Sequence, residues 1–122
     1  MSEEEYQPSA PAAHSITCPS QLVLTGGPYT VECTIDYESN GFSITTVLFT
    51  GYDSSGSEWF STQAGWSDRP TDTTLVASTT QTNAPRLGEL TIAATLINIA
   101  NDVGLEETRS NSVSTTVMVV AP

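Results

Sequence analysis

Residues 87–122 read LGELTIAATLINIANDVGLEETRSNSVSTTVMVVAP, and this stretch decides the fold class of the chain. Apolar side chains recur at every second position over 90–96 and again, with one threonine among them, over 113–119. A period of two puts alternate side chains on opposite faces of an extended backbone, so both segments are predicted to be β-strands. The polar segment 98–104 lies between them and is expected to form the connecting turn.

Shorter segments upstream continue the same pattern. It is cleanest over 29–37, where apolar and polar residues alternate without a break, which is typical of a strand with one buried face. Pro19 is expected to split the first strand, because proline cannot donate a hydrogen bond to a neighbouring strand. We predict strands at 15–18, 21–24, 29–37, 42–52, 58–63 and 73–80 besides the final pair. The predicted core brings together Tyr29, Val31, Cys33, Ile35, Leu90, Ile92, Leu96 and Val117.

The spacing of these strands and the last hairpin carry a resemblance. Segments 88–94 and 112–120, with Asn101-Asp102 between them, are similar to the final hairpin of immunoglobulin-like domains in bacterial and bacteriophage surface proteins. The resemblance covers about 15–121 and implies an all-β fold, an immunoglobulin-like antiparallel sandwich of about seven strands. The chain lacks the Cys-Trp-Cys arrangement of antibody domains, and Leu90 and Ile92 stand where a tyrosine would be expected. The resemblance therefore implies a fold and leaves the function open.

One domain with a preceding arm is predicted. Residues 1–14 are acidic and proline-rich, without apolar periodicity, and are expected to form an extended arm; residues 15–122 form the sandwich. The glutamates Glu3, Glu4 and Glu5 have no cation within the arm to pair with. We therefore expect the arm, including Tyr6, to contact a partner or a neighbouring subunit.

The charge balance narrows the class of partner. The chain has 14 acidic residues, three Arg or Lys residues in total and a formal net charge of −11. Nucleic acid and anionic membranes are poor partners for such a surface, because binding to either begins with cations that neutralise phosphate. The longest apolar run, 117–121, is too short to span a bilayer. Three glutamates near Met1 stand where a secretory signal would be basic and then apolar, so no such signal is expected.

Cys18 and Cys33 are the two cysteines, and two interpretations of them stay open. If the chain reverses between 22 and 27, the two residues fall nearly opposite each other and a disulfide is feasible. In the chain-entropy model such a bond contributes about 3 kcal/mol. The alternative is a pair of buried thiols that act as small apolar side chains.

The sequence offers little to support catalysis or cofactor binding. His14 is the single histidine and lies in the arm, no cysteine has a neighbouring base, and zinc and phosphate-loop spacings are missing. We predict that the chain is not an enzyme and holds no metal or other cofactor. Oxygen-bearing residues do gather between the last two strands, but calcium is the less favoured interpretation because tight turns use the same residues. They are Asn98, Asn101, Asp102, Glu106 and Glu107.

Aromatic and apolar residues in excess of one core indicate an interface. Trp59 and Phe60 are adjacent, so in a regular strand one should face outward. Such a side chain could be covered by 64–72, contact another subunit or stack on a sugar. Met118 and Val120 are apolar on the face opposite Val117 and Val119, which predicts cover on both faces. The predicted partner interface comprises Glu3, Glu4, Glu5, Tyr6, Trp59, Trp66, Met118 and Val120.

These expectations together favour a non-enzymatic structural or binding module. The leading hypothesis is a bacteriophage virion accessory protein, such as a capsid decoration or minor structural protein, bound to a larger protein assembly or to neighbouring subunits. The alternative is a cell-surface adhesion or carbohydrate-binding module from a longer exported bacterial protein. The predicted location is accordingly the virion or, for the alternative, the cell surface.

Overall fold

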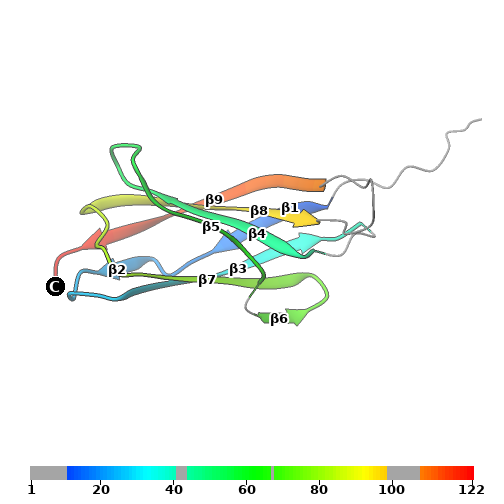
Figure 1. The fold of residues 1–122 in the computed structure, drawn as a ribbon, viewed down its shortest axis with the longest axis horizontal. Helices are drawn as coiled ribbons and strands as arrows, with labels where there is room; N and C mark the ends of the chain where they lie inside the picture. Colours follow the sequence, from blue (N-terminus) through cyan, green and yellow to red (C-terminus); the bar gives the residue numbers. More distant parts are fainter. Residues whose placement is uncertain (1–10, 41–43, 67, 99–107) are drawn as a thin grey trace, which may run out of the picture.

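A computed structural model describes residues 11–40, 44–66, 68–98 and 108–122. The described chain forms two packed β-sheets, which confirms the predicted all-β sandwich (Figure 1). The sheets contain nine strands: β1 (Ala12–Thr17), β2 (Gln21–Val23), β3 (Tyr29–Glu38), β4 (Thr46–Tyr52), β5 (Glu58–Ala64), β6 (Asp68–Thr71), β7 (Thr74–Gln81), β8 (Gly88–Asn98) and β9 (Thr108–Val120).

The strand order explains how the two layers are joined. One sheet has the order β1-β3-β7-β6 and the other has the order β2-β9-β8-β4-β5. The predicted split at Pro19 sends the two halves of the first strand to different sheets. β1 pairs with β3 antiparallel, whereas β2 pairs with β9 parallel, with Leu22 opposite Val119. A short proline-containing link thus ties the four-stranded sheet to the edge of the five-stranded one.

The core lies between the inner faces of the two sheets, as the alternation predicted. Along β3 every odd-numbered residue from Tyr29 to Tyr37 is buried and every even-numbered one is exposed. Ile35 and Leu75 of the four-stranded sheet are fully buried, as are Leu90 and Ile92 of the five-stranded sheet. All eight residues predicted to meet in the core belong to one cluster of buried side chains.

The final pair of strands forms the longest antiparallel ladder, with Leu90 opposite Val117 and Ala94 opposite Val113. The register shifts between Thr95 and Ile97. The extra residue of this shift lies on β9, because two steps along β8 match three along β9. Leu96 and Ile97 are adjacent and both fully buried, but only Leu96 belongs to the core cluster between the sheets.

A second irregularity corrects the prediction that either Trp59 or Phe60 faces outward. Both are buried, with 8% and 4% of their surface exposed. Gly51 pairs with Phe60 while Tyr52 pairs with Glu58, so Trp59 is an extra residue in β5. The inserted residue breaks the two-residue period, which the adjacent-residue argument assumed. Phe60 also packs where Gly51 has no side chain, since a Cβ there would lie 2.7 Å from the Phe60 ring.

The boundaries also differ from the predicted ones. β1 begins at Ala12, so the sandwich starts three residues before the predicted boundary at Ser15. Ala13 is buried and exchanges two hydrogen bonds of 2.9 Å with the Asn111 side chain of β9, which fixes it to the opposite sheet. The described ranges hold nine strands rather than about seven, because the first strand is split and β6 lies between 63 and 73, where no strand was predicted.

Candidate functional site

The outer surface of the five-stranded sheet is the candidate site, and it is built from rows of paired residues. The middle row crosses β5, β4, β8 and β9, and a second row lies beside it. Their side chains point away from the core, because the residues between them along β4 and β8 are buried. We call these eight residues the uncharged face: Ser61, Thr50, Ala93 and Ser114 in the middle row, and Gln63, Leu48, Thr95 and Ser112 in the second.

Larger apolar side chains surround this face toward the end where β2 pairs with β9. Tyr52 continues the outward side of β4, and Met118 continues that of β9. Val23 of β2 pairs with Val120, so the two lie side by side at the sheet edge. The exposed fractions are large for such side chains: 38% for Tyr52, 41% for Met118, 39% for Val23 and 53% for Leu87, which directly precedes β8.

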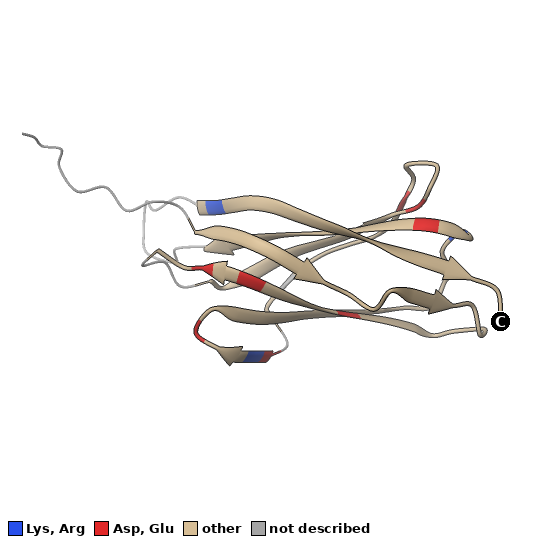
Figure 2. Cartoon of the chain, turned by 180° about the vertical axis from the view of Figure 1, so that it is seen from behind, with Lys and Arg blue, Asp and Glu red and all other residues tan. Residues whose placement is uncertain are grey.

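The opposite outer surface, on the four-stranded sheet, has another composition. Exposed residues of β3 include Glu32, Asp36 and Glu38, and β6 adds Asp68. In Figure 2 acidic residues follow β3 and flank β6, and others lie on β8 and around the turn between β4 and β5. The long strand β9 carries one charged residue, Arg109, near its start. We call the outward side of β1, β3, β7 and β6 the acidic face. Within the described residues, every large apolar side chain recorded as exposed lies outside its four strands.

The acidic face is also held by its own hydrogen bonds. Asp36 accepts hydrogen bonds from the hydroxyl groups of Ser15 and Thr74, on the strands to either side of β3. Thr30 and Thr80 pair through their hydroxyl groups at 2.9 Å. Cross-strand pairs of this kind stabilise a solvent-facing sheet and leave its surface hydrophilic.

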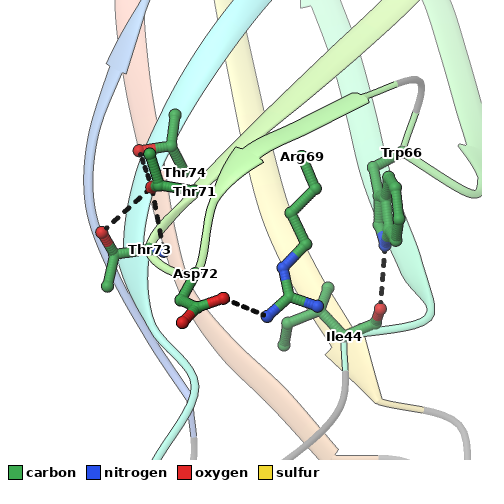
Figure 3. Close-up of polar contacts among 7 residues, drawn as sticks. All are labelled: Ile44, Trp66, Arg69, Thr71, Asp72, Thr73 and Thr74. Atoms are coloured by element: carbon green, nitrogen blue, oxygen red, sulfur yellow. Dashed lines mark hydrogen bonds and ion pairs between the residues drawn. The ribbon is translucent and has the colours of Figure 1, made fainter.

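Trp66 has a fixed orientation at the far end of β5. Its indole Nε1–H donates a 3.0 Å hydrogen bond to the carbonyl oxygen of Ile44, while 37% of its surface is exposed (Figure 3). Nearby, Arg69 and Asp72 form an exposed ion pair at 3.7 Å across the turn that joins β6 to β7. The hydroxyl group of Thr71 contacts those of Thr73 and Thr74 in the same turn. Trp66 is therefore an anchored aromatic side chain with part of its ring on the surface.

The residues predicted to form one interface do not lie together in the structure. Met118 is exposed and Val120 is half-buried on the outer side of β9, next to Val23. The prediction that Trp59 belongs to the interface is wrong. Trp59 lies in the core, and its indole N–H donates a 2.9 Å hydrogen bond to the carbonyl oxygen of Asn83. Trp66 lies at the other end of the sheet from Met118, because β5 ends beside Val47 and Leu96, whereas Met118 pairs with Glu89 at the start of β8. The arm residues Glu3, Glu4, Glu5 and Tyr6 lie outside the described residues.

Sequence reasoning missed Val23, Leu87 and Tyr52 as exposed apolar residues. Tyr52 could have been found, because it shares the parity of Leu48 and Thr50 along β4. Val23 could not, since its neighbour is set by the parallel pairing of β2 with β9, which joins residues almost a hundred positions apart.

Cys18 and Cys33 form a disulfide with their Cα atoms 4.4 Å apart. The pairing does not arise from a hairpin over 22–27. Instead Thr17 pairs with Thr34 in the β1–β3 ladder, and this register brings the next residue, Cys18, beside Cys33. The bond closes the four-stranded sheet at the point where the chain leaves for β2.

No metal-binding group of three or more His, Cys, Asp or Glu residues occurs within the described ranges. Of the calcium candidates only Asn98 is described; Asn101, Asp102, Glu106 and Glu107 lie outside the described residues. The part of the chain that the structure covers also shows no pocket, and no helix in it is long and apolar enough to cross a membrane. The candidate site is thus a surface rather than a cavity.

No protein-family model, no curated protein and no solved structure matches this chain.

Proposed function

We propose that this chain is a non-enzymatic structural module of immunoglobulin-like type that binds a larger assembly, as a capsid decoration or minor structural protein of a bacteriophage virion. The observation that carries the binding role is the segregation of the surface. Exposed apolar side chains belong to the five-stranded sheet or its flanking segments. Of the eight acids among the described residues, five belong to the other sheet and its turn, and three, Asp53, Glu58 and Glu89, belong to the five-stranded side. Exposed apolar groups that collect on one side of a small domain are typical of protein contact sites.

The strand order supports the immunoglobulin-like type. In that fold the strands lettered A, B, E and D form one sheet, and C, F and G form the other, extended by C′. If β2 is taken as the detached end of the first strand, the order β1-β3-β7-β6 corresponds to A-B-E-D. The order β5-β4-β8-β9 corresponds to C′-C-F-G. The disulfide departs from the antibody pattern, because Cys18 and Cys33 link neighbouring strands of one sheet rather than the two sheets.

The virion assignment rests on the resemblance of the last hairpin to domains of bacteriophage surface proteins, together with the binding surface. A net charge of −11 keeps such a protein soluble and directs it toward protein partners rather than phosphate-rich ones. The acidic arm adds a second contact, for which we propose a receiving surface that carries Arg or Lys.

A second candidate function is adhesion or carbohydrate binding at a bacterial cell surface. The observation that favours it is Trp66, whose ring is partly exposed and whose orientation is fixed by the bond to Ile44. Indole rings placed in this way stack on sugars. The disulfide suits an oxidising location such as a cell surface, although virions meet the same conditions after release.

Particle fractionation separates the two functions. An antibody raised against the domain is used on density-purified phage particles and on washed bacterial surfaces from the source of the sequence. A virion protein is expected in the particle band, with regular labelling in electron micrographs and a fixed copy number by quantitative mass spectrometry. Absence from particles combined with labelling of cell surfaces would overturn the virion assignment. Saturable binding on a glycan array that is lost in Trp66→Ala would then support the sugar-binding alternative.

The arm is tested by truncation, and the structure dictates where to cut. Removal of residues 1–13 would delete Ala12 and Ala13 from β1 and break both hydrogen bonds to Asn111. Removal of residues 1–10 leaves the strand intact. We expect this shorter truncation to leave the melting temperature nearly unchanged and to weaken binding to particles at low salt, with a smaller effect at high salt. Full occupancy by the truncated chain at low salt would show that the arm is dispensable.

A further inference from the structure

Exposed apolar side chains gather on the outer side of the five-stranded sheet, at the end where β2 pairs with β9. Val23 and Val120 pair across these two strands, and Met118 lies on the same side of β9. Tyr52 of β4 faces the same side of the sheet. We call Val23, Tyr52, Met118 and Val120 the apolar end. Apolar side chains gathered in this way mark a contact site, but they do not by themselves define the partner.

Two exposed carboxylates lie among these side chains. Glu58 of β5 pairs directly with Tyr52. Glu89 of β8 pairs directly with Met118. Glu89 is also a diagonal neighbour of Tyr52, because Tyr52 pairs with Thr91, two residues further along β8. Diagonal neighbours in a sheet lie about 7–8 Å apart. Tyr52 therefore has a carboxylate on each side, one on β5 and one on β8.

These two carboxylates differ from most of the others in lacking a partner within the chain. Five of the eight acids in the described ranges accept a hydrogen bond or form an ion pair: Asp36, Glu38, Asp53, Asp68 and Asp72. The other three, Glu32, Glu58 and Glu89, have no such partner among the described residues. Two of these three lie beside the exposed side chains of the apolar end, whereas Glu32 lies on the acidic face.

We infer that the apolar end binds an arginine-bearing segment of another protein, with the guanidinium group on the Tyr52 ring between Glu58 and Glu89. Arginine fits this site better than lysine, because its flat guanidinium group stacks on an aromatic ring and donates two hydrogen bonds to a carboxylate. The methylene groups of the arginine and the apolar residues beside it pack on Met118 and Val120. The site thus joins an apolar contact to the neutralisation of two carboxylates.

The charge of the chain favours a different, basic protein over a second copy as the occupant. The chain has 14 acids against three Arg or Lys residues, and one of the three, Arg69, is paired with Asp72. Two copies joined through the apolar end would bring like carboxylates together, which repel. The inference rests on the proposed function in one respect, namely that this side of the sheet meets a protein. It does not depend on whether the assembly is a virion or a cell surface.

NMR titration of the full chain with two short peptides tests the inference. In the first peptide leucine and arginine alternate, and in the second each arginine is replaced by citrulline, which keeps the shape of the side chain and removes its charge. We expect the arginine peptide to bind in the millimolar range and to shift the amide signals of Tyr52, Glu58, Glu89 and Met118. The citrulline peptide should bind about fivefold more weakly, because it loses the cation. Added salt should weaken the arginine peptide.

Glu58→Gln and Glu89→Gln keep the shape of each side chain and remove its charge. Each should weaken the arginine peptide about threefold, and the double variant about tenfold. Glu32→Gln is the matched control, because Glu32 is an exposed and equally unpartnered carboxylate on the other sheet. It should leave binding unchanged, and melting temperatures show that each variant is folded.

Equal binding of the two peptides, or a double variant that binds as the wild type does, would overturn the inference. So would amide shifts centred on β3, because they would assign the peptide to the acidic face. These outcomes are independent of the particle fractionation. A chain that is found in particles but does not bind the arginine peptide would retain the proposed function and lose this inference.

Discussion

Both sheets bury alternate residues on their inner faces, but the composition of their outer faces differs. In β3 and in β8 alternate residues are buried, and the inner faces meet in one cluster. On the outside, β3 alone carries three acids, whereas the strands of the five-stranded sheet carry two, Glu58 and Glu89, both at the end near Tyr52 and Met118. The inner face is constrained because a polar side chain there would be desolvated. The outer face is free of that constraint, so its composition reports on contacts rather than on folding.

The largest expected effect contrasts the two sides of β3. Val31 has 4% of its surface exposed, so Val31→Asp would place an unpaired carboxylate in the core. We expect a loss of more than about 4 kcal/mol, enough to prevent folding in a domain of this size. Thr34→Asp, on the exposed side, should cost about 1 kcal/mol or less. Urea denaturation measures both. Equal midpoints for the two variants would show that the inner and outer faces have been assigned wrongly.

The next effect compares two tryptophans of the five-stranded side. Trp59→Ala would empty a core position and remove the hydrogen bond to Asn83, with an expected cost of about 3–5 kcal/mol. Trp66→Ala removes a partly exposed ring and should cost about 1 kcal/mol. Thermal melts and intrinsic fluorescence, which should be blue-shifted for Trp59, measure the difference. A larger cost for Trp66 would contradict the placement of Trp59 in the core.

Loss of the disulfide should be felt where the chain passes from one sheet to the other. In the chain-entropy model a loop of this length contributes about 3 kcal/mol, so the double variant Cys18→Ala, Cys33→Ala should lose about 2–3 kcal/mol. Hydrogen exchange should rise most at the amide of Leu24, which donates to Val120 at the β2–β9 contact. The amides of β8 serve as the internal reference. Unchanged exchange at Leu24 would mean that β2 is held without help from the bond.

The sequence predicted what the two-residue period controls. Long strands, the one-sided burial of 29–37 and the identity of eight core residues follow from alternation, because each depends on local parity. The split of the first strand at Pro19 was predictable because proline has no backbone N–H to donate to a neighbouring strand. These features need no knowledge of which strands are neighbours.

The misses share a physical cause. The predicted outward position of Trp59 or Phe60 was wrong because a bulge in β5 changes which side of the strand each residue faces. That bulge depends on the partner strand β4 and on the space left by Gly51. Val23 depends on the register between β2 and β9, which are far apart in sequence. The Cys18–Cys33 disulfide, one of two open interpretations, is present, but it arises from the β1–β3 register instead of the expected hairpin. The short strand β6 has four exposed residues, so no alternation marks it. The uncharged face itself becomes visible only once β5, β4, β8 and β9 are set side by side.

The smallest expected effect concerns the turn from β4 to β5, which borders the uncharged face. One carboxylate oxygen of Asp53 accepts hydrogen bonds from the hydroxyl and backbone N–H of Ser55 and from the backbone N–H of Ser57, at 2.6, 2.9 and 3.0 Å. The Ser55 hydroxyl contributes most to holding the pKa of Asp53 below its ordinary value. Desolvation opposes it, and the two backbone N–H groups and the positive charge of Arg86 add to the lowering of this pKa.

Because the pKa of Asp53 is lowered in the folded state, the direction in which stability changes with pH can be worked out. A carboxyl group whose pKa is lower in the folded state stabilises the fold while it is ionised. Its contribution is complete above the ordinary aspartate pKa of about 3.9 and declines as the pH falls through the lower folded value. An NMR titration of the Asp53 carboxyl carbon should give a lower midpoint in the domain than in a peptide spanning residues 51–58. The stability difference between wild type and Asp53→Ala should shrink in the same acidic range. A midpoint equal to that of the peptide would mean that the turn does not hold the carboxylate in solution, and that β4 and β5 are joined without an anchored turn.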